Sequence, residues 1–509
     1  MFEQFAEENH HPFFNFQQVY RAWRDCRANK RNKLSALAFE VDLEQNLVDL
    51  TEELLERRYR PSASICFYTE KPKCREIFAA DFRDRVVHHL IYNHISPIWE
   101  KTFIFHSFAC RPEKGAHLAV DQLQKMQRRV THGGRKRAFY LKLDIRNFFM
   151  TIDRRLLFEM LAQKHHRPDL RWLLETVIFH DCTQDYEMKD RENLRFRLPP
   201  HKSLFHARPD CGLPIGNLTS QFFANVYLNA LDQFVKHDLK CRFYLRYVDD
   251  LVLLHCDAVK LRTWQEEIRR FLAEKLRLKL NPKATKLGLV TGGVDFGGFV
   301  VRPNYCLVRR RTVGNLKTKL KIFRVRNVQL RRSFTMYRFD SEEIDALTAA
   351  INAYLGHFQH ADCDNLLQKL WQKHAFLQRY FSISNKKVKR FDAGLRKQPT
   401  LKRQVSWLGW KYGNYARLIQ IGNYYEVLGK QAVELAPALD VNVIKGWRGY
   451  RHACGFPAKL LPRMVKKLEH AKIPVLAVRQ TGRECLYAKE RLPYMIIDGY
   501  EESFNGRTL

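Results

Sequence analysis

The sequence predicts an α+β protein whose short buried strands carry acidic residues at their ends. Apolar residues over 243–254 are interrupted by Asp249 and Asp250, which is typical of two strands joined by a tight turn. Another strand is predicted over 139–143, and Asp144 ends it. Apolar residues at helical spacing over 1–60 and 258–277 supply the α part of the prediction.

The aspartates suggest a metal site only when they are taken together. A solvated Asp-Asp turn is the commoner interpretation of Asp249 and Asp250, and Asp144 alone suits a helix N-cap. Adjacent carboxylates repel each other, however, and hard oxygen ligands suit Mg²⁺ or Mn²⁺. A strand-end aspartate beside an Asp-Asp turn is the arrangement that two metal ions need in nucleotidyl transfer.

A glycine-rich loop followed by a helix favours this second interpretation. Gly212, Pro214 and Gly216 predict a loop whose backbone can approach a ligand closely, before an apolar helix. With this loop the chain resembles the reverse transcriptases. Asp144 matches their motif A, the Gly212 loop matches motif B, and the Tyr-x-Asp-Asp box of motif C stands at 247–250. The resemblance implies a right-hand polymerase with fingers, an RRM-like palm and a helical thumb.

The same resemblance implies the residues of the active site. Two Mg²⁺ ions, with Mn²⁺ as an alternative, are expected on Asp144, Ile145, Asp249 and Asp250, and Lys283 is the motif D candidate for protonating pyrophosphate. Phe149 matches the steric gate that excludes a ribose 2′-hydroxyl. The segment 64–79 is predicted to be a hairpin and is similar to the fingers hairpin of the family, whose Lys and Arg hold the triphosphate. The other expected dNTP contacts are Lys73, Arg75, Ile215, Gly216 and Gln221.

Template and primer contacts are implied in the same way. They include a fingers loop, the motif C tyrosine, a paired-glycine primer grip and a basic run where the family has its thumb. The residues are Arg111, Gly115, Tyr247, Gly297, Gly298, Arg309, Arg310, Lys317 and Lys321.

The composition agrees with a nucleic-acid partner. A formal net charge of +34 over 509 residues requires a polyanion, and no apolar run is long enough to favour a membrane. The resemblance to reverse transcriptases implies template RNA and cDNA as an RNA–DNA duplex, dNTPs, and an accessory protein or structured non-coding RNA as the expected partners. Twelve cysteines without a Cys-x-x-Cys pair, and no secretory segment, predict a cytoplasmic protein.

The predicted domains follow the motif order. They are an N-terminal helical segment over 1–60, fingers and palm over 61–300, a thumb over 301–384, a basic linker over 385–404 and a C-terminal domain over 405–509.

Motif B suggests a subgroup of the family. Ile215-Gly216 and Ser220-Gln221 resemble the enzymes of diversity-generating retroelements, which copy a template RNA into cDNA with errors opposite adenine. A retron-like or antiphage defence enzyme shares this motif and stays open as an alternative. A non-catalytic RNA-binding scaffold is a second alternative, which the intact carboxylates disfavour.

The C-terminal region, read as strand, helix, helix and strand, resembles the N-terminal mismatch-recognition domain of MutS as a small α/β domain. Its Phe-x-Glu wedge matches Tyr424 and Glu426, and a tyrosine keeps a face for stacking. A small α/β docking module is an equally good interpretation of this region.

Overall fold

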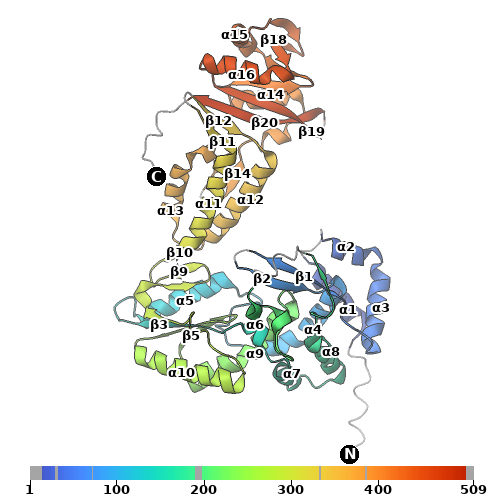
Figure 1. Cartoon of the computed structure of the whole chain (residues 1–509), viewed down its shortest axis with the longest axis vertical. Coiled ribbons are helices and arrows are strands. Elements are labelled where there is room, and N and C mark those ends of the chain that lie inside the picture. The colour runs from blue at the N-terminus through green and yellow to red at the C-terminus, as the bar shows by residue number, and fades with distance from the viewer. Residues whose placement is uncertain are drawn as a thin grey trace, which may run out of the picture. The chain divides into compact units, whose positions relative to one another are not determined.

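The computed structural model describes residues 14–28, 33–70, 73–189, 198–331, 334–384, 387–485 and 487–499. The chain forms two compact units, Met1–Tyr305 and Cys306–Leu509, each with its own sheets and helices (Figure 1). None of the described helices is long and apolar enough to cross a bilayer.

The first unit is built around a four-stranded antiparallel sheet in the order β5-β6-β3-β7. Its strands are β3 (Phe139–Asp144), β5 (Phe243–Tyr247), β6 (Asp250–His255) and β7 (Lys286–Leu289). The strand over 139–143 and the hairpin over 243–254 are therefore confirmed. Alternating residues face opposite sides of a strand, so Leu141 and Leu253 enter the large core while Val252 faces the other way.

Helices cover both faces of this sheet (Figure 1). α10 (Ala258–Lys275) contacts β3, β6 and α9, and α5 (Ala116–Val130) contacts β5 and β6. The predicted apolar stripe of α10 is buried through Leu261, Trp264, Ile268 and Leu272. The other helices of the unit are α1 (Phe16–Arg27), α2 (Leu34–Val41), α3 (Leu43–Leu55), α4 (Phe82–Glu100), α6 (Phe148–Thr151), α7 (Arg154–Ala162), α8 (Pro168–Phe179) and α9 (Leu218–Gln233).

A smaller sheet has the order β2-β1-β4, with β1 (Ser64–Thr69) and β2 (Arg75–Ala79) as the hairpin expected from the sequence. β4 (Tyr186–Met188) runs parallel to β1 and comes from the polar segment that shows no clear sequence pattern. β8 (Val294–Phe296) and β9 (Phe299–Val301) form another hairpin. In the N-terminal helices Leu47, Leu50 and Leu54 are buried, whereas Leu34 is 84% exposed, so the predicted packing face is confirmed only in part.

The second unit combines helices with one eight-stranded sheet in the order β11-β12-β20-β19-β15-β16-β18-β17. β15 and β19 are parallel, and the other pairs are antiparallel. These strands are β11 (Val328–Leu330), β12 (Phe334–Arg338), β15 (Ala416–Ile421), β16 (Tyr424–Leu428), β17 (Ile444–Trp447), β18 (Tyr450–Pro457), β19 (Val475–Cys485) and β20 (Ala488–Gly499).

Two apolar cores flank this sheet. One contains Ile419 and Val478 with residues of the helices α11 to α14, and the other contains Leu418 and Ala477 with residues of α15 and α16. These helices are α11 (Arg310–Asn327), α12 (Ser341–Phe358), α13 (Asp364–Lys373), α14 (Leu401–Lys411), α15 (Lys430–Leu439) and α16 (Leu461–His470).

The structure differs from the predicted boundaries in this unit. β12, from the predicted thumb, pairs with β20 of the predicted C-terminal domain, so the two ranges share one sheet. The predicted linker over 385–404 contains β14 (Val388–Arg390), which pairs with β13 (Phe381–Ile383), and the first turn of α14. Val388 and Leu395 are buried there, because a few well-placed apolar residues are enough to hold a basic segment on a core.

Acid should destabilise the protein through His88, which is buried in α4. Burial, and next the charge of His89, lowers the pKa of His88 to about 3. In the unfolded state the pKa of His88 is near 6.5, so this histidine binds a proton there at pH values at which the folded state keeps it neutral. The free energy of unfolding therefore falls as the pH drops below about 6.5. Between pH 7 and 5 this one group accounts for about 2 kcal/mol.

We expect His88→Leu to reduce by about that amount the loss of unfolding free energy between pH 7 and 5. The measurement is denaturant unfolding at both pH values, with the exposed His237→Leu as the matched control. An unchanged pH dependence in His88→Leu would contradict the assignment.

Candidate active site

Strand register brings the three predicted aspartates together. In the pairing of β3 with β6, Asp144 lies directly opposite Asp250, and Asp249 occupies the two-residue turn that precedes β6. Like charges at opposite positions of an antiparallel pair are destabilising. The Asp144–Asp250 pair is therefore destabilised by electrostatic repulsion, which the apolar pairs of the same sheet do not experience.

The electrostatics of the turn reflect this crowding. Burial, followed by the charges of Asp144 and Asp250, raises the pKa of Asp249 to about 7. Burial also raises the pKa of Asp250, although Lys142 opposes the shift with its Nζ 3.3 Å from Oδ1. The site thus has more negative charge than its own cations balance.

The donor chemistry of this cluster fits Mg²⁺. It offers hard carboxylate oxygens that are partly removed from water, and a cation would relieve their mutual repulsion. Among the residues that the structure describes, no three His, Cys, Asp or Glu side chains are already gathered closely enough to hold an ion. Asp144 Oδ2 accepts a hydrogen bond of 2.8 Å from Asn281 Nδ2.

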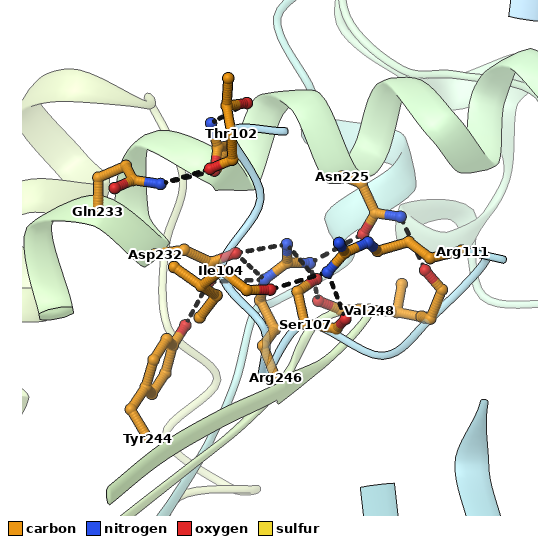
Figure 2. A network of polar contacts seen from close by, with 12 residues as sticks. Thr102, Ile104, Ser107, Arg111, Asn225, Asp232, Gln233, Tyr244, Arg246 and Val248 are labelled. Atoms are coloured by element: carbon orange, nitrogen blue, oxygen red, sulfur yellow. Dashed lines mark hydrogen bonds and ion pairs between the residues drawn. The ribbon is translucent and has the colours of Figure 1, made fainter. Parts of the chain in front are cut away.

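A buried ion pair contacts Val248, the residue before Asp249 (Figure 2). Arg246 and Asp232 are both fully buried, and Arg246 donates from Nε and Nη2 to the carboxylate at 2.8 and 2.7 Å. Tyr244 donates to the same carboxylate at 2.8 Å. Burial alone would lower the pKa of Arg246, but Asp232 outweighs it and the net shift is upward, so the guanidinium stays charged.

The remaining donors of Arg246 reach the turn and two neighbouring elements. Nη1 donates to the carbonyl of Val248 at 3.1 Å and to Asn225 of α9 at 3.2 Å, and Nη2 donates to Ser107 at 3.0 Å (Figure 2). Val248 has φ of 55°, a left-handed conformation that is unfavourable for a β-branched residue. The bond from Arg246 helps to hold this strained turn, and with it Asp249.

The predicted dNTP contacts come from the β1–β2 hairpin and the motif B loop. Lys73 and Arg75 are exposed, and their charges lower the pKa of Asp250 and Asp249 respectively against the larger upward effects. Gly216 has φ of 130°, and a Cβ there would lie 3.1 Å from the carbonyl oxygen of Phe78. Only glycine therefore lets this loop dock on β2, where the carbonyl of Ile215 accepts from Phe78 N–H at 3.0 Å.

The side chain of Phe149 is half-buried and packs in the same apolar cluster as Ile215, whereas Phe148 is buried in the large core. Gln221 is exposed in the first turn of α9. Ile145, beside Asp144, is buried.

Lys283 lies exposed in a turn that Asn281 anchors, because the N–H of Asn281 donates to the carbonyl of Asp144 at 2.8 Å. The structure thus ties the segment of Lys283 to the end of β3.

The predicted template and primer residues of the first unit lie in several turns and loops, and they differ in burial. Gly297 and Gly298 form the turn between β8 and β9, and Tyr247 packs edge-on against Phe296 at 6.3 Å. Gly115 has φ of 138° and precedes α5. The side chain of Arg111 is nearly buried and donates to Glu100 and to the carbonyls of Ile104 and Ser107, so it stabilises its own loop.

The other predicted contacts belong to the second unit. Arg310, Lys317 and Lys321 are exposed along α11, and Arg309 precedes that helix. Tyr424 is 52% exposed at the start of β16. Glu426 is buried, accepts a bond of 3.0 Å from Trp447 Nε1 and pairs with Arg448, so its carboxylate is engaged within the protein.

Sequence reasoning missed the residues that support the aspartates. They are Arg246, Asp232, Asn225, Asn281 and Lys142. A signal was present, since Asp232 and Arg246 each stand beside apolar residues in predicted buried elements, where an unpaired charge is too costly. Only their pairing across α9 and β5 required the fold.

Comparison with known proteins agrees with this site. Residues 69–304, which contain β2 to β9 and all the aspartates above, match the family model described as Reverse transcriptase (RNA-dependent DNA polymerase). This segment is a reverse transcriptase domain, the domain of an RNA-directed DNA polymerase, which is a nucleotidyltransferase.

Two individual proteins are similar to the chain. Protein YkfC of Escherichia coli (strain K12) is 26% identical over 319 residues, which cover 56% of this chain and 75% of that protein. A solved apo telomerase from Candida tropicalis, truncated from its C-terminal domain, has a TM-score of 0.33 and 11% identity. The match covers 49% of this chain and 55% of the telomerase chain, and at this level it carries no argument about function.

The Arg246–Asp232 pair makes a testable contribution to stability. Arg246→Met leaves a buried carboxylate without its partner, so we expect the free energy of unfolding to fall by about 3–5 kcal/mol. Arg246→Met combined with Asp232→Asn removes both charges and keeps an acceptor for Tyr244, so the double variant should recover most of that loss.

Denaturant unfolding of the single and double variants measures both effects. Arg270→Met, an exposed arginine of α10, is the matched control and should change stability by less than about 0.5 kcal/mol. Equal losses in the single and double variants would contradict the coupling.

Proposed function

We propose that this protein is a magnesium-dependent RNA-directed DNA polymerase that copies a template RNA into cDNA. The observation that carries the proposal is the register of β3 against β6, which sets Asp144 opposite Asp250 and beside Asp249 within a reverse transcriptase domain. Asp144, Asp249 and Asp250 would hold Mg²⁺, which would supply charge neutralisation for the triphosphate and a lower pKa for the attacking 3′-hydroxyl. The carbonyl of Ile145 is a further proposed ligand.

The chain's own residues then bind and orient the reactants. Lys73 and Arg75 hold the triphosphate, because an arginine can grip phosphate oxygens in a bidentate manner. Lys283 is the proposed donor of a proton to the leaving pyrophosphate. Arg246 keeps the turn of Asp249 in place from below, through its bond to the carbonyl of Val248.

Sugar selection is assigned to Phe149. Its side chain is half-buried and packs in the same apolar cluster as Ile215, so apolar neighbours restrict its position while part of it stays exposed. A rigid aromatic edge at the nucleotide excludes the additional oxygen of a ribonucleotide by contact rather than by hydrogen bonding.

Within the family we propose the diversity-generating retroelement type, in which cDNA carries errors opposite template adenine. The support is Ile215 in place of a polar residue beside the nucleotide. An apolar side chain there removes a hydrogen bond that could check base-pair geometry. A retron-like or antiphage defence enzyme is the alternative, and accurate copying would favour it. We also propose that the C-terminal region binds nucleic acid as a MutS-like module, with exposed Tyr424 as the stacking residue.

Purified protein with a co-expressed RNA, dNTPs and Mg²⁺ should synthesise cDNA. We expect Asp249→Asn to lower the rate roughly 10²- to 10³-fold, because several kcal/mol of charge stabilisation depend on this carboxylate. The exposed Asp238→Asn is the matched control and should retain full activity.

Sequencing the cDNA separates the subtypes. Errors concentrated opposite adenine support the diversity-generating type, and accurate cDNA moves the assignment to the defence class. Equal background synthesis by the wild type and Asp249→Asn on several RNAs would overturn the polymerase proposal in favour of a binding scaffold.

Phe149→Ala should relax sugar selection. We expect the preference for dNTP over rNTP to fall about 10- to 100-fold, because a space for the 2′-hydroxyl opens. The ratio of kcat/KM for the two nucleotides measures this effect, and Phe149→Tyr, which keeps the ring, is the control. An unchanged ratio in Phe149→Ala would remove the steric-gate assignment.

A further inference from the structure

A basic cavity lies in the first unit at the end of the β5–β6 hairpin opposite to the aspartate turn. Its volume is about 560 Å³, and Phe243, Leu254 and His255 contribute to its wall. Phe243 begins β5, whereas Tyr247 ends it beside the turn. Four residues of strand separate them by about 13 Å, so the cavity is distinct from the candidate active site.

The cavity is lined by cations from four parts of the chain. They are Arg129, Lys136, Lys240, Arg242 and Lys260. All five side chains are exposed, no Asp or Glu of the described chain lines the cavity, and none of the five forms an ion pair within the described residues. A concave surface with charges of one sign concentrates counter-ions strongly.

The backbone at this place is also unusual. His132 and Lys240, which both line the cavity, have φ of 47° and 52°, a left-handed conformation that only glycine adopts freely. Such strain is costly and collects at functional sites. His132 and Lys240 stand in two different segments, and both segments contribute basic side chains to the lining of the cavity.

The aromatic walls of the cavity indicate which part of a ligand it suits. Arg242 lies over the ring of Phe243 at 5.4 Å, and Lys260 lies over Trp264 at 5.4 Å. Trp264 is only 5% exposed. Because these rings already stack with the protein's own cations, they hold the charges in place and are not free to stack on bases. Because base stacking is excluded, the cavity suits the phosphate backbone of a nucleic acid and does not read its bases.

We propose that this cavity is a second RNA-binding site, which holds the phosphodiester backbone of an RNA segment outside the copied duplex. It goes beyond the proposed polymerase function, because it needs neither the aspartates nor a nucleotide. The segment has two sources with the same chemistry: the uncopied 5′ overhang of the template, or a separate structured RNA. Each neutralised phosphate releases counter-ions, so binding at this site should weaken with salt.

The test compares Lys240→Gln/Lys260→Gln with Arg270→Gln/Lys275→Gln in the full-length chain. The control pair removes the same charge from exposed positions of α10 that do not line the cavity. Three labelled probes are used: a 20-base-pair RNA–DNA hybrid with a 5-nucleotide RNA overhang, the same hybrid with a 40-nucleotide overhang, and a 40-nucleotide RNA hairpin. Kd is measured for each probe between 0.05 and 0.3 M salt.

If the template overhang occupies the cavity, the cavity variant loses roughly 10- to 30-fold in affinity at 0.1 M salt for the long-overhang hybrid only. The logarithmic salt slope should fall by about 1.4, since two phosphate contacts with single-stranded RNA are lost. If a separate RNA occupies it, the same loss is confined to the hairpin. Kd values within twofold of the control pair for both of these probes would overturn the proposal.

Primer extension on the short-overhang hybrid keeps this result separate from the polymerase proposal. Both variant pairs should extend that primer at the wild-type rate, because neither pair touches the aspartate turn. Loss of RNA affinity with normal extension supports the second site. Normal RNA affinity in every variant would overturn the second site. No extension even by the wild type would overturn the polymerase proposal, and the two results are independent.

Discussion

The buried pair of Arg246 and Asp232 is the interaction on which the candidate active site depends. It joins α9 to β5, receives Tyr244, and reaches the loop of Ser107 and the carbonyl of Val248 (Figure 2). Charges removed completely from water are tolerated only when every donor and acceptor is matched. Such a pair is specific rather than simply stabilising, because a small displacement of either element would leave a charge unpaired. The Asp249 turn is therefore connected, through Val248, to a fully buried ion pair.

The turn of Val248 and Asp249 has two destabilising features. Val248 adopts a left-handed backbone, and Asp144 lies opposite Asp250 in adjacent strands. Strain and like-charge repulsion both reduce stability, and neither is needed to complete the sheet. Hard carboxylate oxygens of this kind suit a divalent cation, and the charges of Lys73 and Arg75 lower the pKa of Asp250 and Asp249 respectively. The surrounding apolar core of the sheet supplies the stability that the turn gives up.

The second unit shows how one sheet can unite ranges that look separate along the chain. β12 and β20 pair across about 160 residues of sequence. In α11, Leu316, Leu320 and Phe323 enter the core, while Arg310, Lys317 and Lys321 stay exposed. Within the C-terminal region, Glu426 accepts a hydrogen bond from Trp447 and pairs with Arg448, whereas Tyr424 is exposed. Any nucleic-acid contact there would therefore use the aromatic ring and the many surface cations rather than this carboxylate. Charge is thus distributed over both units, in keeping with a polyanionic partner.

The sequence by itself determined the α+β class, the strand at 139–144, the two hairpins at 64–79 and 243–255, and the grouping of Asp144, Asp249 and Asp250, because alternation, turn residues and motif spacing are local properties. It could not determine the partners of buried charges. That Arg246 meets Asp232, that Asn281 binds Asp144, and that Arg111 turns inward depend on how distant elements pack. The same holds for the sheet that joins β12 to β20 and for the basic cavity, whose cations are up to 131 positions apart along the chain. Long-range pairing is a property of the tertiary structure, since desolvation and hydrogen-bond matching act between neighbours in space.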